Sequence, residues 1–286
     1  MRVLVWNCQG AGSPLTISQL RKACNLLSPS VVFLCETKNR DKYMETVRKR
    51  LNFDHSAVVE SMNRFGRMAL LWKQEVKITE IHKIVFTIEA HIVDHSQHTN
   101  WWLIGIYASC DATTKKNQWK VLNERKRLWG RRWIVAGDFN DIVSNEEKWG
   151  ERRREEWTFR DFKQFIADNE LIDIGFDGNP WTWCNNWENE GEIKQRLDRM
   201  LCTHTWFQIF DKTRCKHVDN YSSDHSMIMV DTEPKQAKRR KKFIFDKKWI
   251  QQEGITQVIE EAWKLEVEDQ ECTKSLERFL IVEWLF

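Results

Sequence analysis

Short apolar runs that end directly in polar or glycine-containing turns limit the fold of this chain more than any other feature. The runs are rich in Val, Ile, Leu and Trp, the composition of buried strands. Each is therefore predicted to be a strand with a polar group at its end. They are Val3–Trp6, Val31–Cys35, Met68–Trp72, Val85–Val93, Trp101–Ala108, Trp133–Ala136 and Met227–Val230.

Four helical patterns lie between these strands, with apolar residues spaced as on the buried face of an amphipathic helix. Strands and helices mix without strict βαβ alternation, and the runs at 85–93 and 101–108 look like a hairpin. This favours an α/β sandwich with antiparallel sheets over a doubly wound parallel sheet. The helical positions are Ile17, Leu20, Cys24 and Leu27; Met44, Val47 and Leu51; Trp119, Leu122 and Lys126 beside Leu128 and Trp129; and Phe159, Phe162, Phe165 and Ile166.

A change in charge pattern near Pro234 marks the expected domain boundary. The formal charge of +3 is too small to indicate a nucleic-acid partner by itself. Residues 235–248, however, hold eight basic side chains and one acidic one. We expect one domain over residues 1–232. Residues 233–286 are expected to form a basic connector with an amphipathic helix around Ile255 and Val258, as a truncated piece of a longer reading frame.

The cysteines indicate a reducing compartment. Eight are present, none form a CxxC pair, and several lie inside apolar runs, where Cys acts as a small hydrophobic residue. Met1 leads directly into a strand-like segment, which does not resemble a signal peptide. The longest nearly apolar run, Phe279–Phe286, is too short to span a bilayer. We expect a nuclear or cytoplasmic protein that is neither secreted nor bound to a membrane.

Polar clusters at the ends of the predicted strands are the candidate chemical groups. Asn7 follows the first strand and is either a turn former or a site residue. Glu36 follows a buried strand, where a carboxylate needs a metal, a salt bridge or a helix to cap. Asp138 and Asn140 stand two residues apart after a strand, so they point to the same side, although an Asx-rich turn would look similar.

The cluster Ser222-Ser223-Asp224-His225 supplies a carboxylate and a titrating imidazole together. Combined with Asn7 and Glu36, Asp224 completes a set of hard oxygen ligands that suits Mg²⁺, with Mn²⁺ as the second choice, rather than zinc. The chain contains no GxxxxGK[ST], HExxH or Gly-Xaa-Ser-Xaa-Gly motif. A magnesium site is therefore the prediction.

Eight motifs in a fixed order carry a resemblance to the endonuclease/exonuclease/phosphatase superfamily, which includes pancreatic-type DNases and apurinic endonucleases. More closely, residues 1–232 resemble the endonuclease domain of plant non-LTR (LINE-type) retrotransposons, and the chain beyond 234 resembles the connector to their reverse transcriptase. The motifs are VWNCQG (5–10), FLCETK (33–38), MALLW (68–72), GDFN (137–140), EEK (146–148), PWTW (180–183), RLDR (196–199) and SDH (223–225).

The resemblance implies a four-layer α/β/β/α sandwich, in which two packed mixed or antiparallel sheets are flanked by helices and carry the site at one end. It also implies a role for each matching residue. Glu36 would be the main Mg²⁺ ligand, with Asn7 beside it and Asp224 near the metal.

The same resemblance implies the catalytic groups. Asp138 would orient and deprotonate the attacking water, and Asn140 would hold Asp138 and the phosphate. Tyr107 would donate a hydrogen bond to a phosphoryl oxygen. Asp198 would bind His225 and favour its protonated form.

Three residues are expected to contact nucleic acid. Thr182 matches a family threonine near the DNA backbone, with a plain β-branched strand residue as the alternative. Trp183 is a candidate for stacking on bases, and Arg196 belongs to the Arg-Leu-Asp-Arg motif. The run 152–154 (Arg-Arg-Arg) is expected to be a solvated helix start, with phosphate contact as the alternative. Cys110 stands where relatives more often carry glycine or proline.

The implied activity is Mg²⁺-dependent nicking of DNA that leaves a 3′-hydroxyl, by a monomer with no protein partner that the sequence identifies. Two alternatives stay open. One is another phosphoesterase of the same fold, such as an apurinic endonuclease, a deadenylase or an inositol or lipid phosphatase. The other is a nucleic-acid-binding remnant without catalysis, against which the retained site residues weigh.

Overall fold

The computed structural model of the chain describes residues 1–60, 67–187 and 191–234, together with residues 254, 257 and 260. Two compact units divide between Pro234 and Lys235. Apart from those three residues, the expected connector and its amphipathic helix lie outside the described part of the chain. In the part that the structure describes, no helix is long and apolar enough to cross a membrane.

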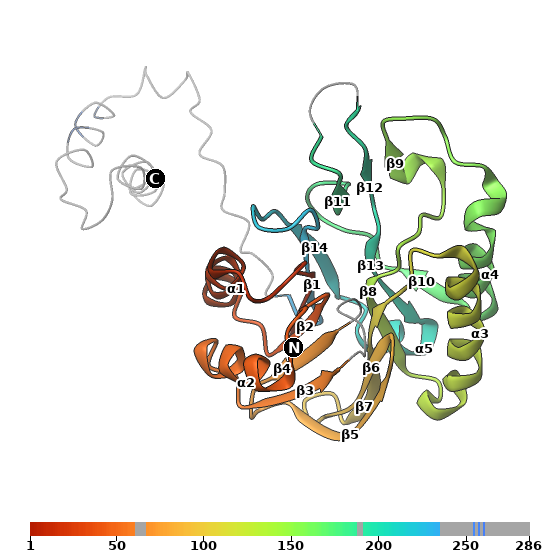
Figure 1. Ribbon diagram of the computed structural model, residues 1–286. Helices are drawn as coiled ribbons and strands as arrows, with labels where there is room; N and C mark the ends of the chain where they lie inside the picture. The colour runs from red at the N-terminus through yellow and green to blue at the C-terminus, as the bar shows by residue number, and fades with distance from the viewer. Residues whose placement is uncertain (61–66, 188–190, 235–253, 255–256, 258–259, 261–286) are drawn as a thin grey trace. The chain divides into compact units, whose positions relative to one another are not determined.

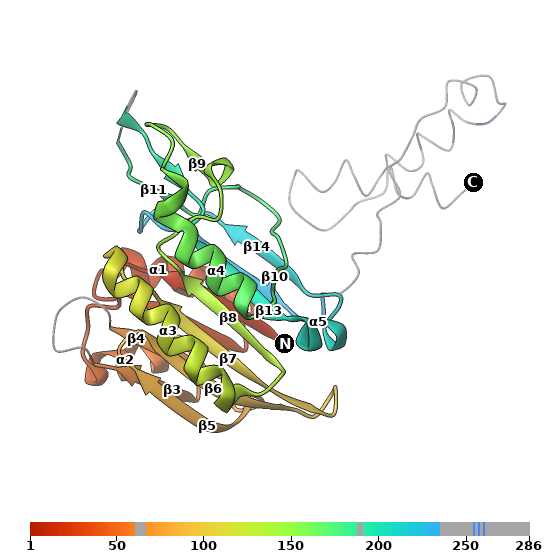
Figure 2. The ribbon, with the colours of Figure 1, turned by 90° about the vertical axis from the view of Figure 1, so that its right-hand side faces the viewer.

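Two six-stranded sheets form the body of the first unit (Figures 1 and 2). The first sheet contains, in spatial order, β14 (Arg214–Val218), β15 (Met227–Asp231), β1 (Arg2–Asn7), β2 (Val31–Cys35), β4 (Met68–Trp72) and β3 (His55–Val59). The second contains β10 (Leu171–Asp173), β13 (Asp198–Thr203), β8 (Trp133–Asp138), β7 (Thr99–Tyr107), β6 (Thr87–Asp94) and β5 (Lys77–Ile84). A small third sheet joins β11 (Trp183–Cys184), β12 (Lys194–Gln195) and β9 (Lys148–Trp149).

Helices cover the outer face of each large sheet. The apolar sides of α1 (Pro14–Leu27) and α2 (Asp41–Arg50) pack on the first sheet. Those of α3 (Ala112–Trp129) and α4 (Arg160–Asp168) pack on the second (Figure 1). The described residues also form three short elements, namely α5 (His204–Ile209) and the 3₁₀ turns η1 (Asn145–Glu147) and η2 (Glu156–Phe159). This is the predicted four-layer α/β/β/α sandwich.

An apolar layer lies between the two sheets. Because strand side chains alternate, Val3 of β1 faces this layer, whereas Leu4 packs beneath α1 with Leu20. Gly105 of β7 lies directly against the ring of Phe33, and a Cβ at this glycine would sit 2.4 Å from the ring carbons. The absence of a side chain at Gly105 therefore lets the sheets pack closely.

Two parallel strand pairs decide where polar groups can gather. β1 pairs parallel to β2 across the α1 crossover, and β7 pairs parallel to β8 across the α3 crossover. Parallel neighbours run in the same direction, so each pair ends at one edge of its sheet. Asn7 and Glu36 come from the first edge, and Tyr107 and Asp138 from the second.

The predicted strands are all present, and β6 and β7 form the predicted hairpin. The ends differ, however, since β6 begins at Thr87 and Val85 lies exposed in the preceding turn. Leu128, predicted beside the buried face of α3, is also exposed. Eight strands were not predicted, because they are short, lie at edges or carry charged residues: β3, β5, β9, β10, β11, β12, β13 and β14.

Candidate active site

Strand register places three predicted site residues in one row. In the second sheet, Tyr107 of β7 pairs with Asp138 of β8, and Asp138 pairs with Asp198 of β13. Paired residues on neighbouring strands point to the same face of a sheet. Three polar groups therefore stand side by side at the end of the sheet, although Asp198 lies sixty residues from Asp138 in the sequence.

The turn after β8 requires both glycine and asparagine. Gly137 has a φ of 151°, and a Cβ there would lie 2.0 Å from the Ile106 carbonyl oxygen. Asn140 has a φ of 48°, a left-handed conformation that asparagine tolerates. Its backbone N–H donates to Asp138 Oδ1 at 2.8 Å, and its Nδ2 donates to Asp138 Oδ2 at 3.2 Å. The contact expected between Asn140 and Asp138 is present.

Asn7 links the two sheets. Its Nδ2 donates to Asp138 Oδ2 at 2.9 Å and to Glu36 Oε1 at 3.1 Å. Glu36, with a φ of 51°, also accepts a hydrogen bond from the Tyr107 hydroxyl at 2.7 Å. Burial first, and then the Glu36 carboxylate, raise the pKa of Tyr107, so its hydroxyl remains a hydrogen-bond donor.

His225 forms a buried pair with Asp198. Its Nδ1 lies 2.8 Å from Asp198 Oδ2, and its Nε2 lies 3.8 Å from Asp138 Oδ2. Burial disfavours the imidazolium, but the charges of Asp198 and Asp138 outweigh this effect and raise the pKa of His225 to about 10. The ring is therefore cationic at neutral pH.

Asp138 is completely buried, and burial is the largest influence on its ionisation. Burial raises its pKa to about 7, with Asp198 adding to the effect and the His225 charge opposing it. A carboxylate that exchanges its proton near neutral pH suits a general base.

Two donors hold Asp224 by the same oxygen. Gln9 Nε2 donates to Asp224 Oδ2 at 2.8 Å, and Trp183 Nε1 donates to it at 2.9 Å. The other oxygen, Oδ1, lies 4.0 Å from His225 Nε2. Trp183, expected to stack on bases, thus binds a predicted metal ligand. Gln9 was not predicted, and only its position two residues after Asn7 could have drawn attention to it.

An open groove of about 440 Å³ reaches some of these groups, whereas Asn7, Tyr107, Asp138 and Asp198 are not part of its lining. The predicted site residues that line it are Glu36, Asn140, Trp183, Asp224 and His225. The others are Gln9, Cys110, Lys115, Arg154, Gln195 and Leu197. Lys115 was missed because a lysine on an amphipathic helix looks like a solvated one.

The oxygen donors of the groove fit a hard divalent cation. Glu36 and Asp224 both present carboxylates to it, and such oxygens suit Mg²⁺. Asn7 directs its amide nitrogen toward Glu36, so ligation through its oxygen requires the amide to turn over. Ligand atoms of Asp138, Asp198 and His225 also lie within 4.8 Å of one another. Two groups of residues could therefore hold a metal, namely this cluster and the carboxylates of Glu36 and Asp224 that line the groove.

Thr182 and Arg196 do not line the groove. Thr182 Oγ1 accepts the backbone N–H groups of Leu197 and Asp198, each at 2.9 Å, which fixes the start of β13. Arg196 is buried in ion pairs with Glu147 at 3.1 Å and Asp173 at 2.8 Å. DNA contact by these two residues stays a prediction, and their present contacts are internal.

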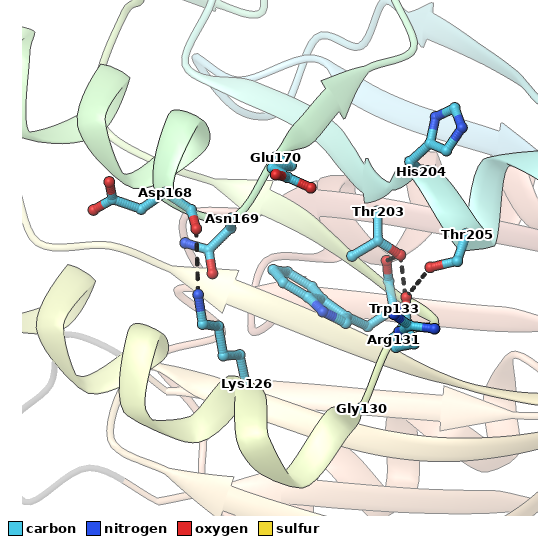
Figure 3. Close-up of a pocket in the computed structure, with 10 residues that line it drawn as sticks. All are labelled: Lys126, Gly130, Arg131, Trp133, Asp168, Asn169, Glu170, Thr203, His204 and Thr205. Atoms are coloured by element: carbon cyan, nitrogen blue, oxygen red, sulfur yellow. Dashed lines mark hydrogen bonds between the residues drawn. The ribbon is translucent and has the colours of Figure 1, made fainter.

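A second cavity, of about 470 Å³, lies at the opposite end of β8 (Figure 3). It is bordered by Trp133 at the start of that strand, whereas Asp138 stands at its end. Its polar groups bond mainly to backbone carbonyls, as Lys126 does to that of Asp168 at 3.3 Å. None of the predicted site residues lines it, so the groove at the other end is the candidate active site.

The sequence model of the Endonuclease/Exonuclease/phosphatase family matches residues 4–225, which include every predicted site residue. The chain belongs to this family. No curated protein sequence matches it. In this endonuclease/exonuclease/phosphatase protein, the row of Tyr107, Asp138 and Asp198 opposite Asn7 and Glu36 makes this end of the sheets the candidate active site.

Solved structures show the same fold at low sequence identity. The endonuclease domain of TRAS1, a telomere-specific non-LTR retrotransposon, has a TM-score of 0.60 and 15% identity, over 80% of this chain and 97% of that one. The 3′-5′ exonuclease NExo from Neisseria meningitidis has a TM-score of 0.60 and 14% identity, over 81% and 99%. The AP endonuclease LMAP from Leishmania major has a TM-score of 0.62 and 14% identity, over 80% and 86%.

Proposed function

We propose that this chain is a Mg²⁺-dependent endonuclease of retrotransposon type that nicks DNA and leaves a 3′-hydroxyl. The observation that carries the proposal is the convergence of Asp138, the Asp198–His225 pair and Glu36 at one end of the two sheets. A general base, a cationic hydrogen-bond donor and a carboxylate for a metal are the groups that phosphodiester hydrolysis needs.

The roles follow from the contacts. Asp138 accepts the proton of the attacking water, and Asn140 and Asn7 keep its carboxylate in place. The His225 imidazolium, held by Asp198, donates to the phosphoryl oxygens and stabilises the charge that grows on them. A Mg²⁺ ion at Glu36 and Asp224 would neutralise phosphate charge and polarise the phosphorus–oxygen bond.

DNA is the proposed substrate. Nucleic-acid enzymes are prominent among the similar structures, including the TRAS1 endonuclease and a NExo complex with a product DNA hairpin. An apurinic endonuclease is the alternative favoured by the likeness to LMAP. The seven described cysteines are free thiols, which fits a reducing compartment such as the nucleus or cytoplasm.

Plasmid nicking tests the proposal. Wild-type protein should relax supercoiled plasmid with Mg²⁺ and not with EDTA, and Asp138→Ala and His225→Ala should abolish the activity. His204→Ala is the matched control, because His204 is an exposed histidine beside the remote cavity. Folded wild-type protein that leaves plasmid intact would refute the nicking function. Cleavage only of duplexes with an abasic site would select the apurinic alternative.

A further inference from the structure

Two cations border the groove on the side of Asn140. Lys115 of α3 and Arg154, from the segment between β9 and η2, both line it. On the other side, Glu36 and Asp224 line the groove together with the His225 imidazolium. Since a nucleic-acid backbone is a polyanion, it gains attraction only where positive groups face the groove.

Both cations share one carboxylate that is hidden from the groove. Lys115 Nζ lies 3.0 Å from Asp141 Oδ2, and Arg154 Nη2 lies 2.9 Å from Asp141 Oδ1. The exposed fractions of the three side chains are 7% for Lys115, 25% for Arg154 and 2% for Asp141. Two positive charges and one negative charge leave a surplus of one positive charge, and the positive groups are the ones at the groove wall.

The charge of Lys115 is unfavourable at its position in α3. Lys115 lies in the first turn of α3, close to the positive end of the helix dipole, where a cation is unfavourable. It is nevertheless buried, and its Nζ also donates to the Asn140 carbonyl oxygen at 2.6 Å. A lysine that is buried at a groove wall, where the helix dipole disfavours a cation, is expected at a functional position rather than at a solvated one.

Arg154 is held ready for a ligand. Its backbone exchanges two hydrogen bonds with the Asn145 side chain, at 2.8 and 2.9 Å. Its Nε donates to Thr158 Oγ1 at 3.3 Å, and Nη2 is taken by Asp141. Within residues 1–60, 67–187 and 191–234, no acceptor is recorded for Nη1. The guanidinium of this groove-lining residue is thus held by Thr158 and Asp141 and keeps Nη1 as a further donor.

We propose that Lys115 and Arg154 form a phosphate subsite, which binds a backbone phosphate of the nicked strand next to the scissile phosphodiester. The inference rests on the proposed function, because it names where that substrate is held. Lys115 also donates a hydrogen bond to the Asn140 carbonyl oxygen. A phosphate bound at this subsite therefore lies beside the loop whose Asn140 N–H positions Asp138.

The test is equilibrium binding of a fluorescein-labelled DNA duplex, measured by anisotropy in EDTA over a series of salt concentrations. Arg154→Gln should reduce the steepness of the plot of log association constant against log salt concentration by about 0.9, because one phosphate contact is lost. At about 0.1 M salt this change corresponds to binding that is about 8-fold weaker. Arg154→Lys should restore most of the slope. Arg153→Gln removes the same charge from an exposed neighbour that does not line the groove, and should change the slope far less.

Failure of the subsite and failure of the function give different results. If wild type binds and nicks DNA but the salt dependence of binding is the same for Arg154→Gln and Arg153→Gln, the proposed subsite is contradicted and the nicking function stands. If Arg154→Lys binds as weakly as Arg154→Gln at every salt concentration, charge at this position is not what binds the phosphate. If folded wild type neither binds nor nicks DNA, both proposals fall.

Discussion

At the scale of single residues, the neighbours of a carboxylate or imidazole set what it can do in the site. Asp198 gives His225 its charge, and Trp183 with Gln9 orients Asp224. None of these partners needs to touch substrate to affect the reaction. Conservative substitutions that remove one hydrogen bond or one charge therefore test each role separately.

Asp198→Asn should shift the alkaline limit of activity to lower pH. In the wild type, the raised pKa keeps His225 protonated as the pH rises toward about 10. Without the Asp198 charge the imidazole loses its proton at lower pH, and activity is lost with it. At neutral pH we expect nicking about 100- to 10,000-fold slower. The pH–rate profile is the measurement. An alkaline limb that stays in place would contradict the role, and Asp177→Asn, at an exposed carboxylate, is the control.

Trp183→Phe should raise the Mg²⁺ concentration needed for half-maximal nicking about 10-fold, because groups that orient metal ligands commonly affect affinity to this extent. The ring is kept and only the Nε1 donor to Asp224 is lost. Mn²⁺ binding followed by electron paramagnetic resonance gives the same quantity without activity. Trp187→Phe, at a tryptophan that is 69% exposed, should leave both titrations unchanged. Equal Mn²⁺ affinity in the two variants would contradict the role of Trp183 in orienting Asp224.

At the scale of elements, β13 is held by buried charges as well as by its buried apolar residues Met200, Leu201 and Cys202. Arg199, fully buried, lies 2.8 Å from Glu147 Oε2 and 3.5 Å from Asp173. Arg196 binds the same two carboxylates. These pairs join β13 to η1 and β10, on either side of Asp198. The Arg-Leu-Asp-Arg motif thus supplies the carboxylate that pairs with His225 and two arginines that fix its position.

Arg199→Met should destabilise the fold by about 3–5 kcal/mol, because removal of one partner leaves buried carboxylates with too few counter-charges. Urea unfolding followed by tryptophan fluorescence gives the free energy. Arg214→Met is the matched control, since Arg214 and Asp177 form an exposed pair at 3.8 Å that is worth about 0–1 kcal/mol. A loss for Arg199→Met no larger than the control would show that the buried pairs do not hold β13.

At the scale of the whole molecule, the site exists only where the two sheets meet. Asn7 ends β1 and Glu36 directly follows β2 of the first sheet, whereas Tyr107 and Asp138 end β7 and β8 of the second. The Asn7–Asp138 and Tyr107–Glu36 hydrogen bonds cross from one sheet to the other. The spacing of the sheets therefore controls the catalytic geometry, and the contact of Gly105 with Phe33 helps to set that spacing.

Gly105→Ala should cost about 1–3 kcal/mol of stability through overpacking, and should slow nicking because the crossing hydrogen bonds lengthen. Thermal unfolding and plasmid nicking measure the two effects. Gly12→Ala is the control, since its added Cβ meets only the Asn39 side chain, at 3.4 Å. Full activity in a destabilised Gly105→Ala protein would show that the site tolerates a change in sheet spacing.

Much of the candidate site was predictable because its groups follow apolar strands directly. Glu36 and Asp138 stand out as charges at the ends of buried runs, and Asn140 completes a compact motif. The strand that carries Asp198 was missed, because it opens with Asp and Arg and the pattern of a buried strand is broken there. The edge strand β5 was missed for another reason, since most of its side chains are only partly covered.

By itself, the sequence determined the fold class, the buried strands and the chemical groups placed at their ends, because these depend on local patterns of a few residues. Local patterns do not show which of those groups meet: the family resemblance implied the Asp198–His225 and Asn140–Asp138 contacts, and tertiary structure decided the others. Asp198 reaches His225 over 27 residues, and Trp183 reaches Asp224 over 41. It also turned Arg196 inward to Glu147 and brought Lys115 beside Asn140. Such contacts follow from the register of two stacked sheets, which no local pattern encodes.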